Sequence, residues 1–143
     1  MSATYIPLDL RKEVPRSPKD KLCGIVHLPR MIDKVRALKE NALGEYIYPC
    51  PLDKIILSFI RTNEDEFAEK AINLNNEELD GWITQKTNGY SPTEIEFLNK
   101  KILDRKPDNN DRMEYFLEIR NKIDASRTDI TTWAALIDLE EGH

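Results

Sequence analysis

The sequence predicts an all-α fold, a single compact domain of about seven short helices with one short extended segment near 45–48. Patterns that start helices recur along the chain, and apolar residues repeat at helical spacing. Runs with the strict alternation of a half-buried strand are nearly absent. The length of 143 residues fits one domain that buries roughly two-thirds of its unfolded surface.

The chain is expected to begin with an arm and then enter the helical domain. Residues 1–16 contain Pro7 and Pro15 and are predicted to form an N-terminal arm, with the helical domain spanning 17–143. Ser17-Pro18-Lys19-Asp20 has the order of an N-cap serine, a proline at the first helical position and an acidic third residue. A short helix is therefore expected to begin there, ahead of Pro29.

The next helix is predicted from an apolar stripe and a glycine at its end. Met31, Val35, Leu38 and Ala42 follow helical spacing, and Gly44 is expected to end the helix. The segment 45–48 between Gly44 and Pro49 is the one strand-like run. A single strand without a partner cannot make a sheet, so this run is expected to be an extended connection.

Further helix starts follow at regular intervals. A helix is expected to begin at Cys50-Pro51, another at Asn75-Asn76, and Ser91-Pro92-Thr93-Glu94 has the pattern of a capping box. Residues 107–111 form the clearest loop, and 128–129 precede the last predicted helix. The aromatic residues at helical core positions are expected to be buried: Phe59, Phe67, Trp82, Phe97, Phe116 and Trp133.

Composition and charge exclude several classes of protein. Hydrophobic residues make up 40% and charged residues 33%, as in an ordinary globular protein. The net charge of −5 argues against a nucleic-acid partner and against binding to an anionic membrane surface. No apolar run approaches the ~20 residues of a membrane-spanning helix, and residues 1–20 lack a signal peptide's apolar stretch. Two cysteines give no disulfide framework, so a cytoplasmic location is expected.

Several motifs resemble one known family. The motifs RSPKDKL from Arg16, LPRMIDKVRA from Leu28 and LGEYIYPCPLD from Leu43 are similar to those of the bacterial domain of unknown function family numbered 5069. The stretches SPTEIEFLN from Ser91 and RTDITTWAALIDLEEG from Arg127 extend the resemblance to nearly the whole chain. The resemblance implies a compact helical domain and carries no assigned activity.

Cys50 is the residue whose setting most suggests chemistry. A thiol at a helix N-terminus faces unpaired backbone N–H groups, which favours the thiolate. Asp53, three residues later, opposes this effect because its carboxylate competes for the same N–H groups and disfavours a second negative charge. Cys50 as a catalytic thiol, with His27 or Glu45 as proton carrier, therefore stands beside the alternative of a buried cysteine that fills space under a helix start.

A second group of polar residues surrounds the same segment. Arg30 and Lys34 share one helix face, and Glu45 and Tyr46 follow the end of that helix. Because the chain then returns to Cys50, these residues are predicted to line a pocket that binds a small anionic ligand. The alternative is a solvated charged face in which Arg36 pairs with Glu40.

The sequence contains no pattern for a metal or cofactor. The acidic residues match no calcium loop, two histidines make a Cys/His zinc site hard to assemble, and glycine-rich phosphate loops are absent. We therefore expect no metal site and no cofactor. The predicted function is a small-anion ligand-binding or protein-interaction module, with a small thiol-dependent enzyme using Cys50 as the alternative. The sequence also permits a homodimer, through apolar positions on its short helices.

Overall fold

The computed structural model describes residues 5–143, which contain seven helices and one short hairpin. The mostly helical, single-domain fold predicted from the sequence is confirmed. No helix in this part of the chain combines the length and apolar character needed to cross a membrane. In chain order the elements are β1 (Lys21–Leu22), β2 (Ile25–Val26), α1 (Leu28–Lys39), α2 (Pro51–Phe59), α3 (Glu64–Asn73), α4 (Asn76–Lys86), α5 (Pro92–Leu103), α6 (Asn110–Asp124) and α7 (Trp133–Glu141).

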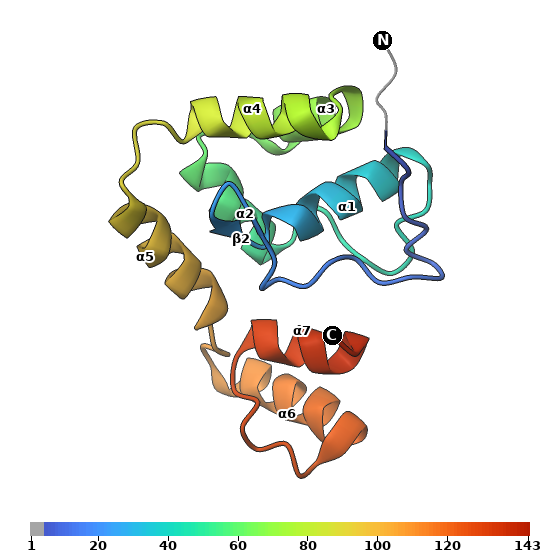
Figure 1. Ribbon diagram of the computed structural model, residues 1–143. Coiled ribbons are helices and arrows are strands. Elements are labelled where there is room, and N and C mark those ends of the chain that lie inside the picture. Colours follow the sequence, from blue (N-terminus) through green and yellow to red (C-terminus); the bar gives the residue numbers. More distant parts are fainter. Residues whose placement is uncertain (1–4) are drawn as a thin grey trace.

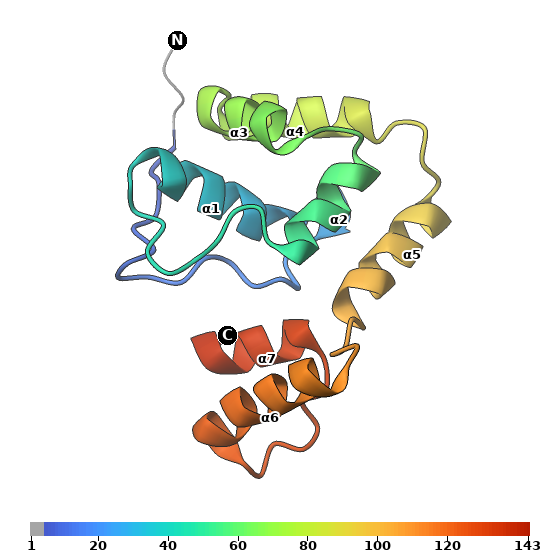
Figure 2. The same cartoon turned by 180° about the vertical axis from the view of Figure 1, so that it is seen from behind.

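The helices are arranged in three tiers joined by α5. Helices α3 and α4 lie across one end, α1 and α2 occupy the middle, and α6 and α7 form the opposite end (Figure 1). Viewed from behind, α5 runs along one side from the first tier to the last (Figure 2). Helix α1 packs against both α2 and α3, whereas α5 packs against β2 and α7. This places the C-terminal helix below the beginning of α1.

Two apolar clusters hold these tiers together. The larger one joins the hairpin to the first five helices, and its fully buried side chains include Ile25, Leu28, Met31, Val35, Ile56, Phe67, Ile83 and Ile102. The smaller one lies between α6 and α7 and contains Phe116, Ile130 and Leu136. Ile137 on α7 packs against the larger cluster, so the last helix belongs to both contacts.

Residues 5–16 lie along the helical body. The Tyr5 hydroxyl donates to the Ile72 carbonyl at 2.8 Å, and the Leu10 N–H donates to the Ala42 carbonyl at 2.8 Å. Gly44 allows this approach, because a Cβ added there would lie 2.9 Å from the Leu10 carbonyl oxygen. The described part of the predicted arm is therefore packed onto the domain, and residues 1–4 lie outside the described residues.

The predicted helix start at Ser17 is wrong. The Asp20 N–H donates to the Ser17 carbonyl, and the chain turns directly into the antiparallel pair of β1 and β2. Cys23 and Gly24 connect the strands with φ of 54° and 77°, the positive values that a two-residue hairpin turn of type I′ requires. Serine and aspartate side chains stabilise turns as well as helix caps, so the pattern did not discriminate between them.

The predicted end of the first long helix is also wrong. Helix α1 stops at Lys39, and Leu38 is 41% exposed although Met31 and Val35 of the same stripe are buried. The Ala42 N–H donates to the Ala37 carbonyl at 2.9 Å, while Asn41 adopts a φ of 53°. Asparagine thus takes the left-handed position that Gly44 was predicted to take.

Other boundaries agree with their local signals. Cys50 precedes α2, Asn75 caps α4, and Ser91 with Glu94 forms the capping box of α5. The segment 45–48 contains a turn and a bend and pairs with no described strand, and the small sheet lies instead at 21–26. A helix cap is formed by residues three positions apart in the sequence, so distant parts of the chain do not alter it.

Two of the six aromatic residues predicted to be buried are fully buried, and the prediction is wrong for the other four. Phe67 and Phe116 are buried as predicted, whereas Phe97 is 74% exposed. Phe59 is half-buried. Trp82 and Trp133 are also half-buried, not largely buried. Their helices lie at the edge of the molecule, so one side of each indole faces solvent while the other packs against the core.

Replacing Phe67 with alanine should lower the free energy of unfolding by about 3–5 kcal/mol, because the ring is fully buried in the larger cluster. The matched Phe97→Ala change should stay within about 0.5 kcal/mol, as at other surface positions. Urea unfolding followed by circular dichroism measures both values. Equal losses for the two variants would contradict this assignment of the core.

Candidate functional site

The carboxylate of Asp53 is the centre of a buried polar cluster. Asp53 is the third residue of α2, and its side chain is fully buried. One oxygen accepts the Cys50 N–H at 2.9 Å, which is the capping contact expected at this position. Two further donors, Lys34 and His27, reach the same carboxylate and hold its pKa at about 2 despite burial. Asp53 is therefore a permanent negative charge inside the protein.

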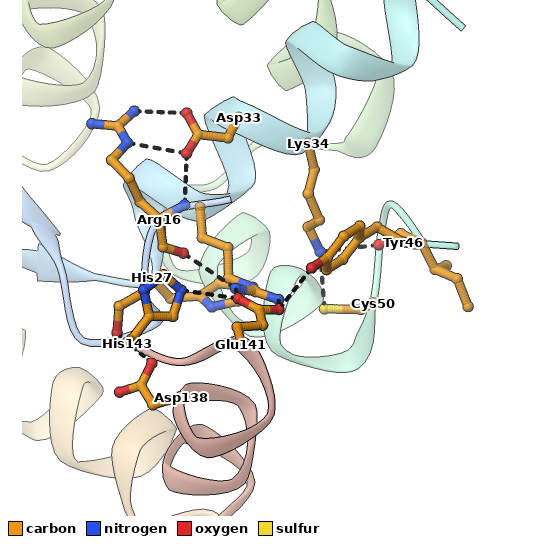
Figure 3. Close-up of polar contacts among 12 residues, drawn as sticks. Arg16, His27, Asp33, Lys34, Tyr46, Cys50, Asp138, Glu141 and His143 are labelled. Carbon is orange, nitrogen blue, oxygen red and sulfur yellow. Dashed lines mark hydrogen bonds and ion pairs between the residues drawn. The ribbon is translucent and has the colours of Figure 1, made fainter. Parts of the chain in front are cut away.

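Lys34 brings a positive charge from α1 to this carboxylate. Its ammonium group lies 2.5 Å from an Asp53 oxygen and 3.0 Å from the Ile47 carbonyl oxygen, and its side chain is 3% exposed. The same ammonium lies 3.4 Å from the Cys50 sulfur, and Figure 3 shows the two side chains meeting from opposite segments. Lys34 thus contacts both the carboxylate and the thiol.

His27 completes the cluster just before α1. Its Nε2 lies 2.6 Å from Asp53, and because a carboxylate only accepts, this nitrogen carries the proton. Burial lowers the pKa of His27, and the positive charges of Lys34 and Arg30 lower it further. Asp53 raises the pKa but does not outweigh these effects, so the ring is neutral. Its Nδ1 is buried and has no hydrogen-bond partner among the described residues.

Cys50 is held as a thiol in this setting. Burial raises its pKa, the negative charge of Asp53 raises it further, and the nearby Lys34 ammonium only partly opposes them. The effect of Asp53 follows the expectation from its position three residues after the cysteine. A helix N-terminus and a lysine are therefore insufficient to produce a resting thiolate here.

A second buried ion pair attaches the C-terminal helix to α1. The Arg30 guanidinium donates to both oxygens of Glu141 at 2.8 and 2.7 Å, and each side chain is 6% exposed. The Tyr46 hydroxyl donates to the same carboxylate at 2.9 Å. Burial and Glu141 raise the pKa of Tyr46 to about 12, which keeps it a neutral donor. The Arg30–Glu141 contact joins residues 111 positions apart in the chain, and the Tyr46–Glu141 contact joins residues 95 positions apart.

An open cavity of about 980 Å³ lies against both ion pairs. The residues predicted to form a pocket all line it: Arg30, Lys34, Glu45, Tyr46 and Cys50. Glu45 is exposed at this wall, whereas Arg30 and Lys34 are buried and paired with carboxylates. The arm contributes Leu10, Arg11, Lys12, Glu13 and Val14, and α7 contributes Ile137, Glu140 and Glu141.

The alternative of a solvated charged face on α1 is wrong. Arg36, the proposed partner of Glu40, is buried and donates to the Ala71 carbonyl at 2.8 Å and to Asn76 at 2.6 Å. Its guanidinium also lies 3.6 Å from the centre of the Tyr5 ring. Helix α1 is surrounded by the arm, α2 and α3, so four of its charged residues are enclosed and only Lys39, in its last turn, is exposed.

Sequence reasoning missed three residues of the site. His27 entered only as a distant base, Asp53 only as a cap, and Glu141 not at all. The one available signal was the concentration of charged residues in an otherwise apolar stretch of α1. Their partners lie on α2 and α7, at separations that no local pattern reports.

These features define a small helical domain with a buried Asp–Lys–His–Cys cluster in the wall of an open cavity. The chain belongs to the DUF5069 family, described as a domain of unknown function, whose family model matches residues 12–143. The resemblance drawn from the five motifs is thereby confirmed. A search of curated proteins finds no match.

Glu141→Gln should destabilise the protein by about 3 kcal/mol, because it leaves the buried Arg30 guanidinium without its anionic partner. Asp9→Asn is the control, since it breaks an arginine–carboxylate pair on the exposed arm and should leave the unfolding midpoint nearly unchanged. Chemical denaturation of the three proteins tests this. Similar midpoints for both variants would show that the Arg30 pair contributes no more than a surface contact.

The stability of the protein should fall between about pH 7 and pH 5 because of His27. Its pKa is lowered on folding, so the unfolded chain takes up a proton near the ordinary value of about 6.5 while the folded chain resists it. Stability from this group is present above that value and decreases by up to about 1.4 kcal/mol per pH unit below it. His27→Gln should flatten this part of the profile in urea titrations, whereas His143→Gln, at the exposed second histidine, should retain it.

Proposed function

We propose that this domain is a ligand-binding module whose cavity takes a small molecule with a single anionic group. The main support for this proposal is that five polar residues from α1, the following loop and the start of α2 line one cavity. A concave site with a few convergent polar groups is the usual form of a small-molecule site. Arg30 and Tyr46 supply donors at one position, and Lys34 supplies a cation deeper in the wall.

The anionic group of the ligand would replace Glu141 on Arg30. A guanidinium binds carboxylates and phosphates with the same bidentate geometry that it uses for Glu141. Glu141 is the last residue of α7, so its side chain would turn to solvent without moving a buried strand or helix. The Tyr46 hydroxyl would then donate to the ligand in place of Glu141.

The charges around the cavity favour a small ligand over a polyanion. Four cationic side chains line it together with four carboxylates: Arg11, Lys12, Arg30 and Lys34 with Glu13, Glu45, Glu140 and Glu141. A nucleic acid would meet these carboxylates and a protein of net charge −5. The free thiols of Cys23 and Cys50 support a reducing, cytoplasmic setting.

The geometry of Cys50 weighs against the thiol-dependent enzyme. A nucleophilic cysteine needs a depressed pKa or an adjacent base, and here burial and Asp53 raise the pKa of the thiol. His27, the nearest candidate base, directs its protonated nitrogen to Asp53. Cys50 is better suited to forming part of the cavity wall.

A thermal-shift screen of small carboxylates and phosphate monoesters should find ligands that stabilise the protein. Tyr46→Phe, which retains the ring and removes one donor, should weaken the best ligand about tenfold, since a hydrogen bond to a charged group contributes about 1.5–3 kcal/mol. Arg30→Met should weaken it by a larger factor. Isothermal titration calorimetry measures the dissociation constants.

Arg36→Met is the matched control, because Arg36 is a buried arginine of the same helix that does not line the cavity. It should reduce stability while leaving the dissociation constant unchanged. The proposal is overturned if no compound in the screen binds, or if Tyr46→Phe and Arg36→Met alter binding equally.

A further inference from the structure

Three side chains of the buried cluster carry the donor atoms of a transition-metal site. One ligand atom from each of His27, Cys50 and Asp53 lies within 4.8 Å of the other two. Imidazole, thiolate and carboxylate are the side-chain ligands that Zn²⁺ binds. The three come from the turn before α1 and from the first turn of α2, two rigid points of the main core.

The structure already holds a cation among these groups. The Lys34 ammonium lies 2.5 Å from an Asp53 oxygen and 3.4 Å from the Cys50 sulfur. The two atoms are therefore arranged around a positive charge, and this charge belongs to a flexible side chain that also contacts the Ile47 carbonyl. Lys34 also lines the open cavity, which provides space for its side chain outside the cluster.

His27 is only partly engaged in the described structure. The ring is fully buried, yet one of its nitrogens has no hydrogen-bond partner among residues 5–143. This nitrogen, Nδ1, is not the one that faces Asp53, so it can carry the ring proton when Nε2 binds a metal ion. His27 and Cys50 both line the cavity, which provides an entry path and space for a water molecule as a further ligand.

We propose that His27, Cys50 and Asp53 form a binding site for a divalent transition-metal ion, with Zn²⁺ as the best-fitting ion. The ion would displace the Lys34 ammonium from Asp53 and keep its fourth position open to the cavity. Ligands of one tetrahedral zinc ion lie about 3.3–3.8 Å apart, as follows from bond lengths of about 2.0–2.3 Å. His27 and Asp53, now 2.6 Å apart, would separate slightly, and Cys50 would move toward them.

The charges balance when the ion binds. The Cys50 thiol releases its proton to solvent and the sulfur forms a bond to the metal, so thiolate and Asp53 together neutralise the divalent ion. His27 coordinates as the neutral ring through Nε2, so Nε2 gives up its proton to solvent and Nδ1 takes one up from solvent. Lys34 keeps its charge and moves toward the Ile47 carbonyl and the solvent-filled cavity. No oxidation or reduction takes place.

Titration of the purified, chelator-treated protein with Co²⁺ tests the site, because cobalt replaces zinc and reports its ligands by absorption. We expect one bound ion per chain, a sulfur-to-cobalt charge-transfer band in the near ultraviolet, and loss of both on adding Zn²⁺. Cys50→Ser should abolish the band and weaken Co²⁺ binding at least tenfold. Cys23→Ser is the matched control and should leave the band intact, since Cys23 lies in the hairpin near Thr84.

Lys34→Met separates this site from the anion site. Removing the competing ammonium should raise the affinity for Zn²⁺ and increase the thermal stabilisation that Zn²⁺ gives, whereas the same variant should weaken binding of a small anion. Arg30→Met should leave Co²⁺ binding unchanged. The metal proposal therefore does not rest on the anion proposal, and the two can fail separately.

His27→Gln should weaken Co²⁺ binding while retaining part of the charge-transfer band, because the sulfur ligand remains. Circular dichroism confirms that each variant used is folded. The metal site is disproved if Co²⁺ gives no charge-transfer band, if the band survives in Cys50→Ser, or if Lys34→Met binds Zn²⁺ more weakly than the unaltered protein.

Discussion

The burial of one carboxylate, Asp53, constrains the arrangement of the first half of this protein. A charged carboxylate without partners inside a protein would cost several kcal/mol, so it must find donors wherever it is enclosed. Asp53 finds them on three segments: the N–H of Cys50, the ammonium of Lys34 and the ring of His27. These contacts fix the start of α2 against α1. The loop between the helices is tied in by the Ile47 carbonyl, which accepts from Lys34.

A second carboxylate, Glu141, has a comparable role at the other side of the cavity. It receives two hydrogen bonds from Arg30 and one from Tyr46, and thereby holds α7 against the beginning of α1 (Figure 3). The cavity lies where these two buried ion pairs approach each other. Its polar wall follows from the contacts that hold the fold together, and both proposed sites use groups that already stabilise the fold. Ligand binding is therefore expected to exchange one ionic partner for another.

The two sites place different demands on Lys34. In anion binding its charge is an attractive element of the wall, whereas in metal binding it competes with the ion for Asp53. The raised pKa of Cys50 is consistent with this arrangement, since a thiol without an ion nearby stays protonated next to a carboxylate. A metal ion is the kind of partner that would convert it to a thiolate. Cys50 thus has a role in the second proposal that does not require it to act as a nucleophile.

Local signals in the sequence predicted most helix boundaries after residue 50. The side chains of Asn75 and Ser91 each accept an N–H three residues later in the chain, so proximity in sequence is sufficient to recognise them. Ser17 has the same local chemistry but stabilises a turn, because the residues that follow pair as β1 and β2. Phe97 precedes the buried Leu98 in sequence but shares its helix face with Glu94 and Lys101, and it is exposed because no other element covers that face of α5 in the described residues.

The candidate site, like the fold, combines features that local sequence predicts with contacts that depend on the packing of distant segments. Position along the chain places Arg30, Lys34, Glu45, Tyr46 and Cys50 in one short stretch and predicts that a helix begins after Cys50. The packing of distant segments determines that Arg30 pairs with Glu141, that Lys34 and His27 meet at Asp53, and that Arg36 is enclosed. Helical periodicity and caps arise from contacts within about four residues. The partner of a buried charge is whichever opposite charge the packing of distant segments brings to it, and periodicity contains no information about that choice.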